Sequence, residues 1–89
     1  MTHYRKTTLV EAVETYAGED GSVFFRKHAP WLQEAFIEGK IFSDGKNMKI
    51  RVKEGILDLE PGSWVVRGAN GAIWPLDAQS FAESYEKVE

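Results

Sequence analysis

The chain has 89 residues, 43% of them hydrophobic, and its fourteen acidic and eleven basic residues give a net charge of −3. This length fits a single domain, residues 1–89, with a modest core, and the charge has the wrong sign for a general DNA-binding protein. The chain contains no cysteine, which excludes disulfides, thiolate metal ligands and a cysteine nucleophile and favours the reducing cytoplasm. Apolar runs reach only three residues, far fewer than a membrane span needs.

The first elements expected along the chain are a strand and a loop. Residues Thr7 to Glu14 favour a strand, although their apolar side chains occupy both faces instead of alternating cleanly. Two glycines and two acids follow in the segment 17–21, which predicts a loop.

A short helical pair is expected next, over about 22–38. Ser22 fits the N-cap of one or two helical turns, because its hydroxyl oxygen can accept a backbone N–H. Pro30 lacks an N–H and therefore suits the first turn of a second helix, over 30–38. Gly39 is the residue expected just beyond the C-terminus of that helix.

The β-rich half begins at Ile41, and its clearest pattern is an alternation of period two. Apolar residues at positions 48, 50 and 52 alternate there with basic residues. Glu54-Gly55 is expected to form a two-residue hairpin loop that returns the chain along this strand.

A second hairpin is expected at Asn70-Gly71, because a type I′ turn needs positive φ at both central residues. Pro61-Gly62 predicts the turn before its first strand, and Pro75 is expected to end the pairing of its second strand. Asp77 is expected to cap a short C-terminal helix over about 78–84.

Together these elements predict an α+β fold, with a small antiparallel sheet built mainly from residues 41–75 and packed with the helices. The partner of the first strand stays open at this point, because one sequence does not show which distant strands pair.

The segment from Pro61 to Gly71 combines special residues at fixed spacing: Pro-Gly-Ser-Trp, two valines, Arg-Gly, a variable pair and Gly. The motifs Tyr4-Arg5-Lys6 and Val10-Glu11-Ala12 precede this segment, and Trp74-Pro75, Phe81 and Tyr85-Glu86 follow it. This set resembles a family of small uncharacterised phage and prophage proteins. The chain departs from the family at Ser63, usually Asp, at Leu76, where Cys is common, and at Thr7-Thr8, usually Lys-Pro.

The resemblance implies a phage or prophage accessory protein that acts in the cytoplasm of a bacterial host. Such proteins often inhibit host defence, as anti-CRISPR proteins do. We therefore expect a non-enzymatic protein that binds a host protein or protein complex, as a monomer or small homo-oligomer, without a membrane or cofactor. A nucleic-acid-binding module and a minor virion component are the alternatives.

Basic residues on the alternating strand are the first candidate for a binding site. These residues are Lys49, Arg51 and Lys53, with Lys46 in the preceding turn. They could bind nucleic-acid phosphates or an acidic partner. Alternatively, with Glu54-Gly55 as the loop, Arg51 faces Asp58 and Lys49 faces Glu60, so that the two strands neutralise each other.

Arg67 and Trp74 are the second candidate, because Asn70-Gly71 as a two-residue loop places them opposite each other. The guanidinium could then stack on the indole. Arg and Trp are enriched at binding hot spots, although the same pair could serve only to cover the sheet. We expect the binding surface on this face, extending towards Lys49 or Arg51.

The opposite face of that hairpin is expected to enter the core through Trp64, Val66 and Ile73.

The sequence offers little for catalysis or metal binding. No Gly-rich phosphate loop or nucleophile motif is present, and the two histidines lack the spacing of metal ligands. Pairs of acids on single elements fit solvated faces better than a catalytic cleft. We therefore expect no enzymatic activity, no bound metal and no cofactor.

Overall fold

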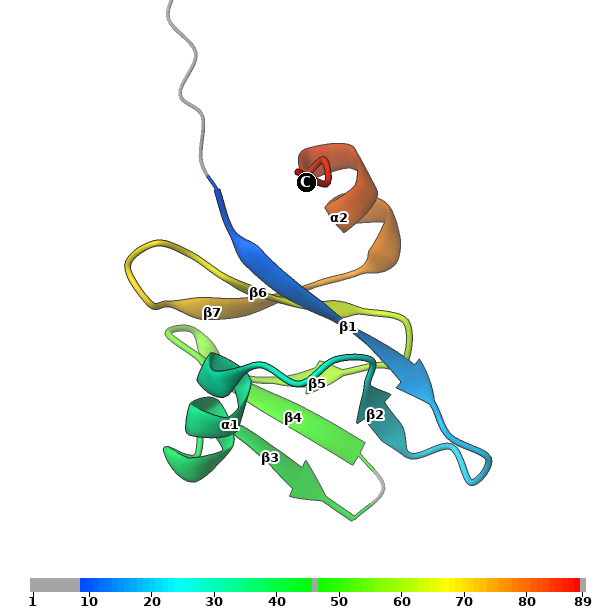
Figure 1. Ribbon diagram of the computed structural model, residues 1–89. Helices are drawn as coiled ribbons and strands as arrows, with labels where there is room; N and C mark the ends of the chain where they lie inside the picture. The colour runs from blue at the N-terminus through cyan, green and yellow to red at the C-terminus, as the bar shows by residue number, and fades with distance from the viewer. Residues whose placement is uncertain (1–8, 46, 89) are drawn as a thin grey trace, which may run out of the picture.

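The computed structural model describes residues 9–45 and 47–88 (Figure 1). Thr7, Thr8, Lys46 and the N-terminal basic segment lie outside these residues. The elements in chain order are β1 (Glu11–Ala17), β2 (Val23–Phe25), α1 (Pro30–Ile37), β3 (Ile41–Asp44), β4 (Asn47–Val52), β5 (Gly55–Leu59), β6 (Trp64–Arg67), β7 (Ile73–Leu76) and α2 (Ala78–Ser84). Two antiparallel sheets with two helices confirm the expected α+β class, although residues 41–75, which were expected to form one sheet, are divided between the two.

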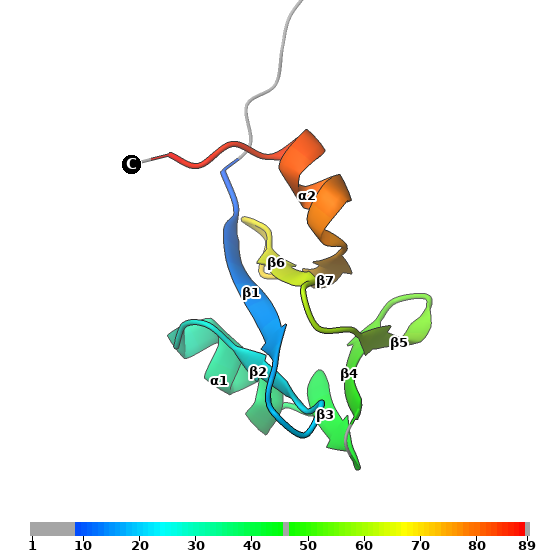
Figure 2. The ribbon, with the colours of Figure 1, turned by 90° about the vertical axis from the view of Figure 1, so that its right-hand side faces the viewer.

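The strands form a four-stranded sheet in the order β2-β1-β6-β7 and a three-stranded sheet in the order β3-β4-β5. The first strand therefore pairs with two strands, β2 and β6. In the pairing with β6, Glu14 lies opposite Trp64 and Val13 opposite Val65. Helix α2 covers one face of the four-stranded sheet, while the three-stranded sheet and α1 lie towards its other face (Figures 1 and 2).

The main core lies between these two layers. Its buried residues are Val13, Leu32, Ala35, Ile41, Ile50, Leu59 and Val65. They come from α1 and from both sheets, and alternate residues of each strand share a face. This shared core joins the two sheets into one packed unit.

The segment 22–29 is not helical, which corrects the expected helical pair. Val23–Phe25 forms β2, paired antiparallel with β1, since β-branched and aromatic residues favour strands. Ser22 does not cap a helix but donates its backbone N–H and its hydroxyl to the Asp20 carboxylate, at 3.0 and 2.9 Å. These two bonds lower the pKa of Asp20 and turn the chain into the β1–β2 hairpin.

Helix α1 confirms the second half of that expectation. Pro30 is its first residue, and Gly39 follows its C-terminus with φ of 78°, in the left-handed region that favours glycine. Leu32 and Ala35 point into the core. Phe36 is partly exposed and meets Phe25 edge to face, with ring centroids 5.7 Å apart.

The loop between β4 and β5 lies one residue earlier than expected, at 53–54, because Val52 pairs with Gly55. As a result Lys49 faces Asp58 and not Glu60, and Arg51 faces Ile56 and not Asp58. Each β4 residue thus pairs with a β5 residue two positions earlier than expected. Because side chains alternate with a period of two, this shift leaves the apolar and charged faces of both strands as the sequence predicted.

The loop between β6 and β7 has three residues, 69–71, and not two. The Gly68 N–H donates to the Ala72 carbonyl at 2.9 Å, and Gly71 has φ of 85°. Arg67 therefore pairs with Ile73, and Val66 pairs with Trp74. This shift by one residue turns every β7 side chain to the other face.

Two expectations for this hairpin are consequently wrong. Trp74 shares a face with Val66 and Trp64, whereas Ile73 lies on the other face, with Arg67, where it packs against the main core as expected. The pairing also continues through Pro75, opposite Val65, because β7 is an edge strand that tolerates a missing N–H.

Candidate functional site

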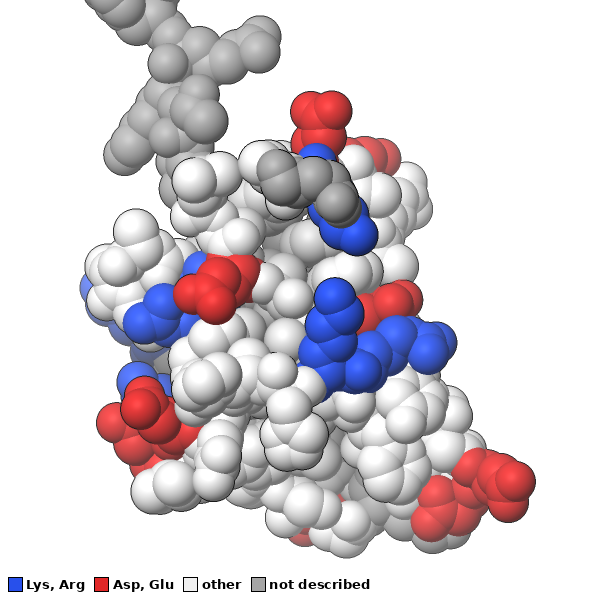
Figure 3. Space-filling view, viewed as in Figure 1, with Lys and Arg blue, Asp and Glu red and all other residues white. Residues whose placement is uncertain are grey.

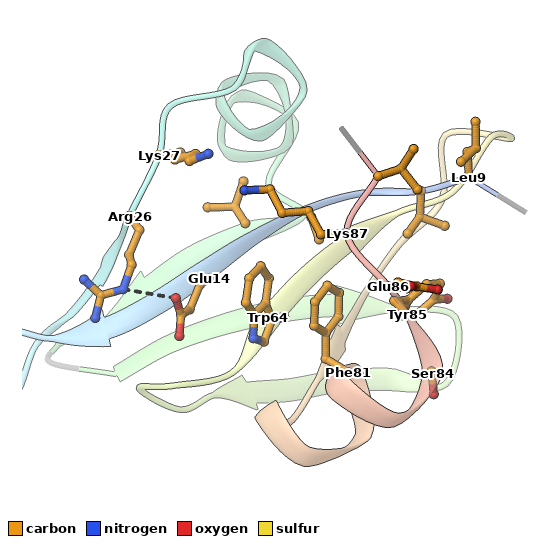
Figure 4. A pocket seen from close by; sticks show the side chains of 14 residues that line it. Leu9, Glu14, Arg26, Lys27, Trp64, Phe81, Ser84, Tyr85, Glu86 and Lys87 are labelled. Atoms are coloured by element: carbon orange, nitrogen blue, oxygen red, sulfur yellow. Dashed lines mark ion pairs between the residues drawn. The ribbon is translucent and has the colours of Figure 1, made fainter.

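A groove with a cavity volume of about 710 Å³ lies between β1, α2 and the segment 85–88 that follows α2 (Figure 4). Apolar and aromatic side chains supply most of its wall. They are Leu9, Val10, Trp64, Phe81, Tyr85 and Val88. The groove is on the face of the four-stranded sheet opposite the main core.

Two stacked rings form the centre of the groove. Trp64 from β6 and Phe81 from α2 lie parallel, with ring centroids 4.1 Å apart and an interplanar angle of 7°. Tyr85 is one helical turn beyond Phe81, with ring centroids 5.4 Å apart. Trp64 was expected in the core, and this stack instead forms a second, smaller cluster between the sheet and α2.

The N-terminus of α2 is fixed by Asp77. Its carboxylate accepts the backbone N–H of Ser80 at 2.7 Å and the Ser80 hydroxyl at 3.1 Å. These hydrogen bonds, the backbone one first, lower the pKa of Asp77. Because the first turn of α2 is held in this way, Phe81 projects back onto Trp64.

Three cations and two acids, Glu14 and Glu86, also line the groove. Arg26 and Lys27 follow β2 on one side, and Lys87 reaches in from the C-terminal segment (Figure 4). Figure 3 shows basic side chains gathered between α2 and the β1–β2 hairpin. An apolar groove with cations at its rim suits an apolar group with a carboxylate beside it.

Arg26 and Lys27 differ in how they are held. The Arg26 Nε lies 3.1 Å from Glu14 Oε1, the Arg26 N–H donates to the Glu14 carbonyl at 2.9 Å, and its guanidinium carbon is 4.7 Å from the ring centroid of Tyr16. Lys27 is exposed and forms no ion pair with another residue in the described ranges. Lys27 is therefore available to a carboxylate of a partner.

The structure does not place Arg67 opposite Trp74. The Arg67 guanidinium instead pairs with Glu11 on β1, Nη1 to Oε1, at 3.3 Å. The indole of Trp74 lies over Gly68, whose added Cβ would be 3.2 Å from two ring carbons. The two side chains that were expected to stack thus belong to opposite faces of the sheet.

The basic residues of the β4 strand lie on the outer face of the three-stranded sheet. Lys49 forms an ion pair with Asp58, and this hydrogen bond raises the pKa of Lys49. Arg51 lies over Phe42, with its guanidinium carbon 5.4 Å from the ring centroid, and Lys53 is exposed in the β4–β5 loop. The expected neutralisation therefore occurs at Lys49, with Asp58 in place of Glu60.

The groove was not predicted from the sequence. Its walls come from residues near both ends of the chain and from β6, and only the pairing of β1 with β6 brings them together. The spacing of Phe81 and Tyr85 by four residues was the one local signal, because it places both rings on the same side of α2.

Within residues 9–45 and 47–88, no group of three or more His, Asp or Glu side chains is placed to hold a metal ion. No helix in the same ranges is long and apolar enough to cross a membrane. Comparison of the chain with protein-family models, with curated proteins and with solved structures found no match.

Proposed function

We propose that this chain is a non-enzymatic phage or prophage accessory protein that binds a protein of its bacterial host, in the manner of anti-CRISPR proteins and other inhibitors of host defence. Two lines of support are the resemblance carried by the segment from Pro61 to Gly71 and the groove beside α2. The groove is the observation that carries the binding function.

The groove has the properties of a docking site for one bulky side chain. Its volume falls in the range of roughly 300–1,000 Å³ typical of ligand pockets. Aromatic walls contribute a large contact area at low cost in side-chain entropy, since an aromatic ring has few rotatable bonds. An apolar anchor of a partner would lie against the stacked rings of Trp64 and Phe81.

The rim adds a preference for acidic partners. Lys27 and Arg26 both line the groove, and Arg26 is held by Glu14 while Lys27 is exposed. A carboxylate next to the apolar anchor would meet these cations at the polar edge of the contact, where charges set specificity and association rate. We therefore expect an acidic residue beside the apolar anchor of the partner.

The proposal is tested by capture of proteins from lysates of bacteria that carry defence systems. The chain should retain a discrete partner, and a double variant with Leu9→Glu and Val88→Glu should lose it. These two residues are 70% and 73% exposed, so that their replacement should leave the fold intact while introducing charge into the groove wall.

Ile37→Glu is the matched control, because Ile37 is 76% exposed on α1 and does not line the groove. It should retain the partner as the unmodified chain does. Recovery of no discrete partner across such hosts, or retention of the partner by the groove double variant, would contradict the proposal.

A further inference from the structure

The outer edge of β5 presents a second surface, which belongs to the three-stranded sheet and not to the sheet that carries the groove. β5 ends the three-stranded sheet and, among the strands that the structure describes, pairs only with β4. Ile56 and Leu57 are 49% and 46% exposed, although both are large and apolar (Figure 2 shows β5 at the edge of the molecule). A strand edge of this kind carries backbone groups that can pair with another strand.

The register identifies the backbone groups that point outwards. Val52 opposite Gly55 closes a two-residue loop, so Gly55, Leu57 and Leu59 direct their N–H and C=O groups towards β4. Ile56 and Asp58 then direct theirs away from the sheet. The Arg51 N–H donates to the Lys40 carbonyl on the β3 side at 2.7 Å, as this alternation requires.

The other strand edges among the described residues are shorter or blocked. β2 has three residues, β3 has four, and β7 contains Pro75, which lacks an N–H. β5 has five residues and contains neither Pro nor Lys, which are the residues that commonly protect an edge. β5 is thus the edge best suited to accept an additional strand.

Side chains on the outer face give this edge a charge pattern. On β5 itself Ile56 and Asp58 share that face, while Glu54 lies in the turn before the strand and Glu60 directly follows it. Asp58 already pairs with Lys49, whereas Glu54 and Glu60 form no ion pair with another described residue. The basic residues of β4 would be two strands away from an added strand, so these acids would be its nearest neighbours.

The same pattern disfavours a second copy of this chain as the occupant. An antiparallel pairing of two β5 strands centred on Leu57 would bring the Glu54 turn of each copy close to Glu60 of the other, at both ends of the paired strands. Like charges directly opposite each other destabilise a strand pair. A basic strand from another protein would meet favourable charges at the same positions.

From this geometry we infer that β5 accepts an extended segment of a partner protein by strand addition, with Lys or Arg opposite Asp58 and close to Glu54 and Glu60 at the two ends, and an apolar residue opposite Ile56. Main-chain hydrogen bonds to Ile56 and Asp58 hold the segment, and the alternating cations select it. This inference does not depend on the groove.

The probe is the end-blocked peptide Lys-Val-Lys-Val-Ile-Val-Lys, whose first Lys would lie opposite Glu60 in an antiparallel pairing. Titration of isotope-labelled protein, followed by amide hydrogen exchange, should show slower exchange at Ile56 and Asp58. The exchange rates of Gly55, Leu57 and Leu59 should change less, because their N–H groups already point towards β4.

A charge-reversal variant tests the choice of partner. Glu54→Lys with Glu60→Lys should weaken binding of this peptide by about tenfold and favour a peptide with Glu in place of each Lys. Glu19→Lys with Glu34→Lys makes the same change in net charge on exposed residues elsewhere and should leave binding unchanged.

Three results would overturn the inference. The first is slower exchange at the groove residues and not at Ile56 and Asp58. The second is equal affinity of the charge-reversal variant for the lysine peptide. The third is protection of Ile56 and Asp58 without peptide, together with a doubled mass in solution, which would assign the edge to a second copy.

Discussion

The indole of Trp64 lies parallel to the ring of Phe81, 4.1 Å from it, and this contact fastens α2 to the four-stranded sheet. Because the two residues belong to β6 and α2, the stack determines where the groove wall stands. The same pair therefore connects the stability of the C-terminal helix to the shape of the candidate binding site.

Removal of the Phe81 ring should detach α2. Phe81→Ala should lower the free energy of unfolding by roughly 2 kcal/mol, less than for a fully buried Phe because the ring is half-buried. Urea denaturation measures this change. Phe24→Ala is the control, since Phe24 is 47% exposed and should cost roughly 0.5 kcal/mol. Equal losses for the two variants would show that the stack does not hold α2.

Gly68 and Trp74 should be energetically coupled. An added Cβ at Gly68 would lie 3.2 Å from two carbons of the Trp74 indole, so Gly68→Ala must displace the ring at a cost of roughly 1 kcal/mol. In a Trp74→Ala background the same substitution should cost less, because only the contact of the added Cβ with Asn70 Oδ1, at 3.3 Å, remains. A double-mutant cycle measured by urea denaturation gives the coupling, and additive losses would contradict the contact.

Local patterns predicted those elements whose ends are marked by special residues. Pro30 and Gly39 bracket α1, and Asp77 caps α2, because each position has a backbone requirement that few residues meet. The segment 22–29 was not predicted correctly, since a short apolar run with a capping residue before it fits a helix and a strand equally well.

The candidate site depended on information that local patterns do not contain. Asn70-Gly71 fits both a two-residue and a three-residue loop, and the difference of one residue moves Trp74 to the other face. The groove also needs β1 beside β6, a pairing between residues about 50 positions apart, which hydrophobic alternation does not specify.

Thr15 should be a sensitive point of the β1 strand. Its buried hydroxyl shares its one proton between the carbonyl oxygens of Glu60 and Ser63, at 3.1 and 2.9 Å, and so fixes the turn between β5 and β6. Thr15→Val keeps the shape but removes the donor, which should cost about 1 kcal/mol.

The measurement for Thr15→Val is denaturation combined with hydrogen exchange. The Gly62 amide, which donates to the Thr15 carbonyl at 3.1 Å, should exchange faster in the variant. The amide of Ile50, in the buried part of β4, should exchange as slowly in the variant as in the unmodified chain, under conditions in which exchange occurs by local opening. An unchanged Gly62 rate would show that the hydroxyl does not hold the turn.

The Asp77 cap should make the order of α2 dependent on pH. Hydrogen bonds from Ser80 lower the pKa of Asp77 in the folded chain. The cap therefore stabilises α2 fully above the unfolded pKa of about 3.9, and this stabilisation is lost as pH falls through the lower, folded pKa. Protection of the Phe81 amide, which bonds to the Asp77 carbonyl, should fall over that acidic window when its exchange rate is compared with the intrinsic rate at each pH.

Asp77→Asn is the control for this prediction, because its amide oxygen can still accept a backbone N–H but does not titrate in that window. The variant should keep α2 ordered at neutral pH and lose the acidic transition of the Phe81 amide. A transition of unchanged size in Asp77→Asn would assign it to another carboxyl.

The basic residues of β4 should not retain nucleic acid strongly. Asp58 neutralises Lys49 through an ion pair. The Arg51 guanidinium lies over the Phe42 ring, and its cross-strand neighbour is the apolar residue Ile56. Mobility-shift assays at low salt should therefore show no complex with single- or double-stranded DNA, and Asp58→Asn should bind more strongly because it frees Lys49. A complex of the unmodified chain that weakens steeply with salt and is lost in Arg51→Glu would instead support the nucleic-acid alternative.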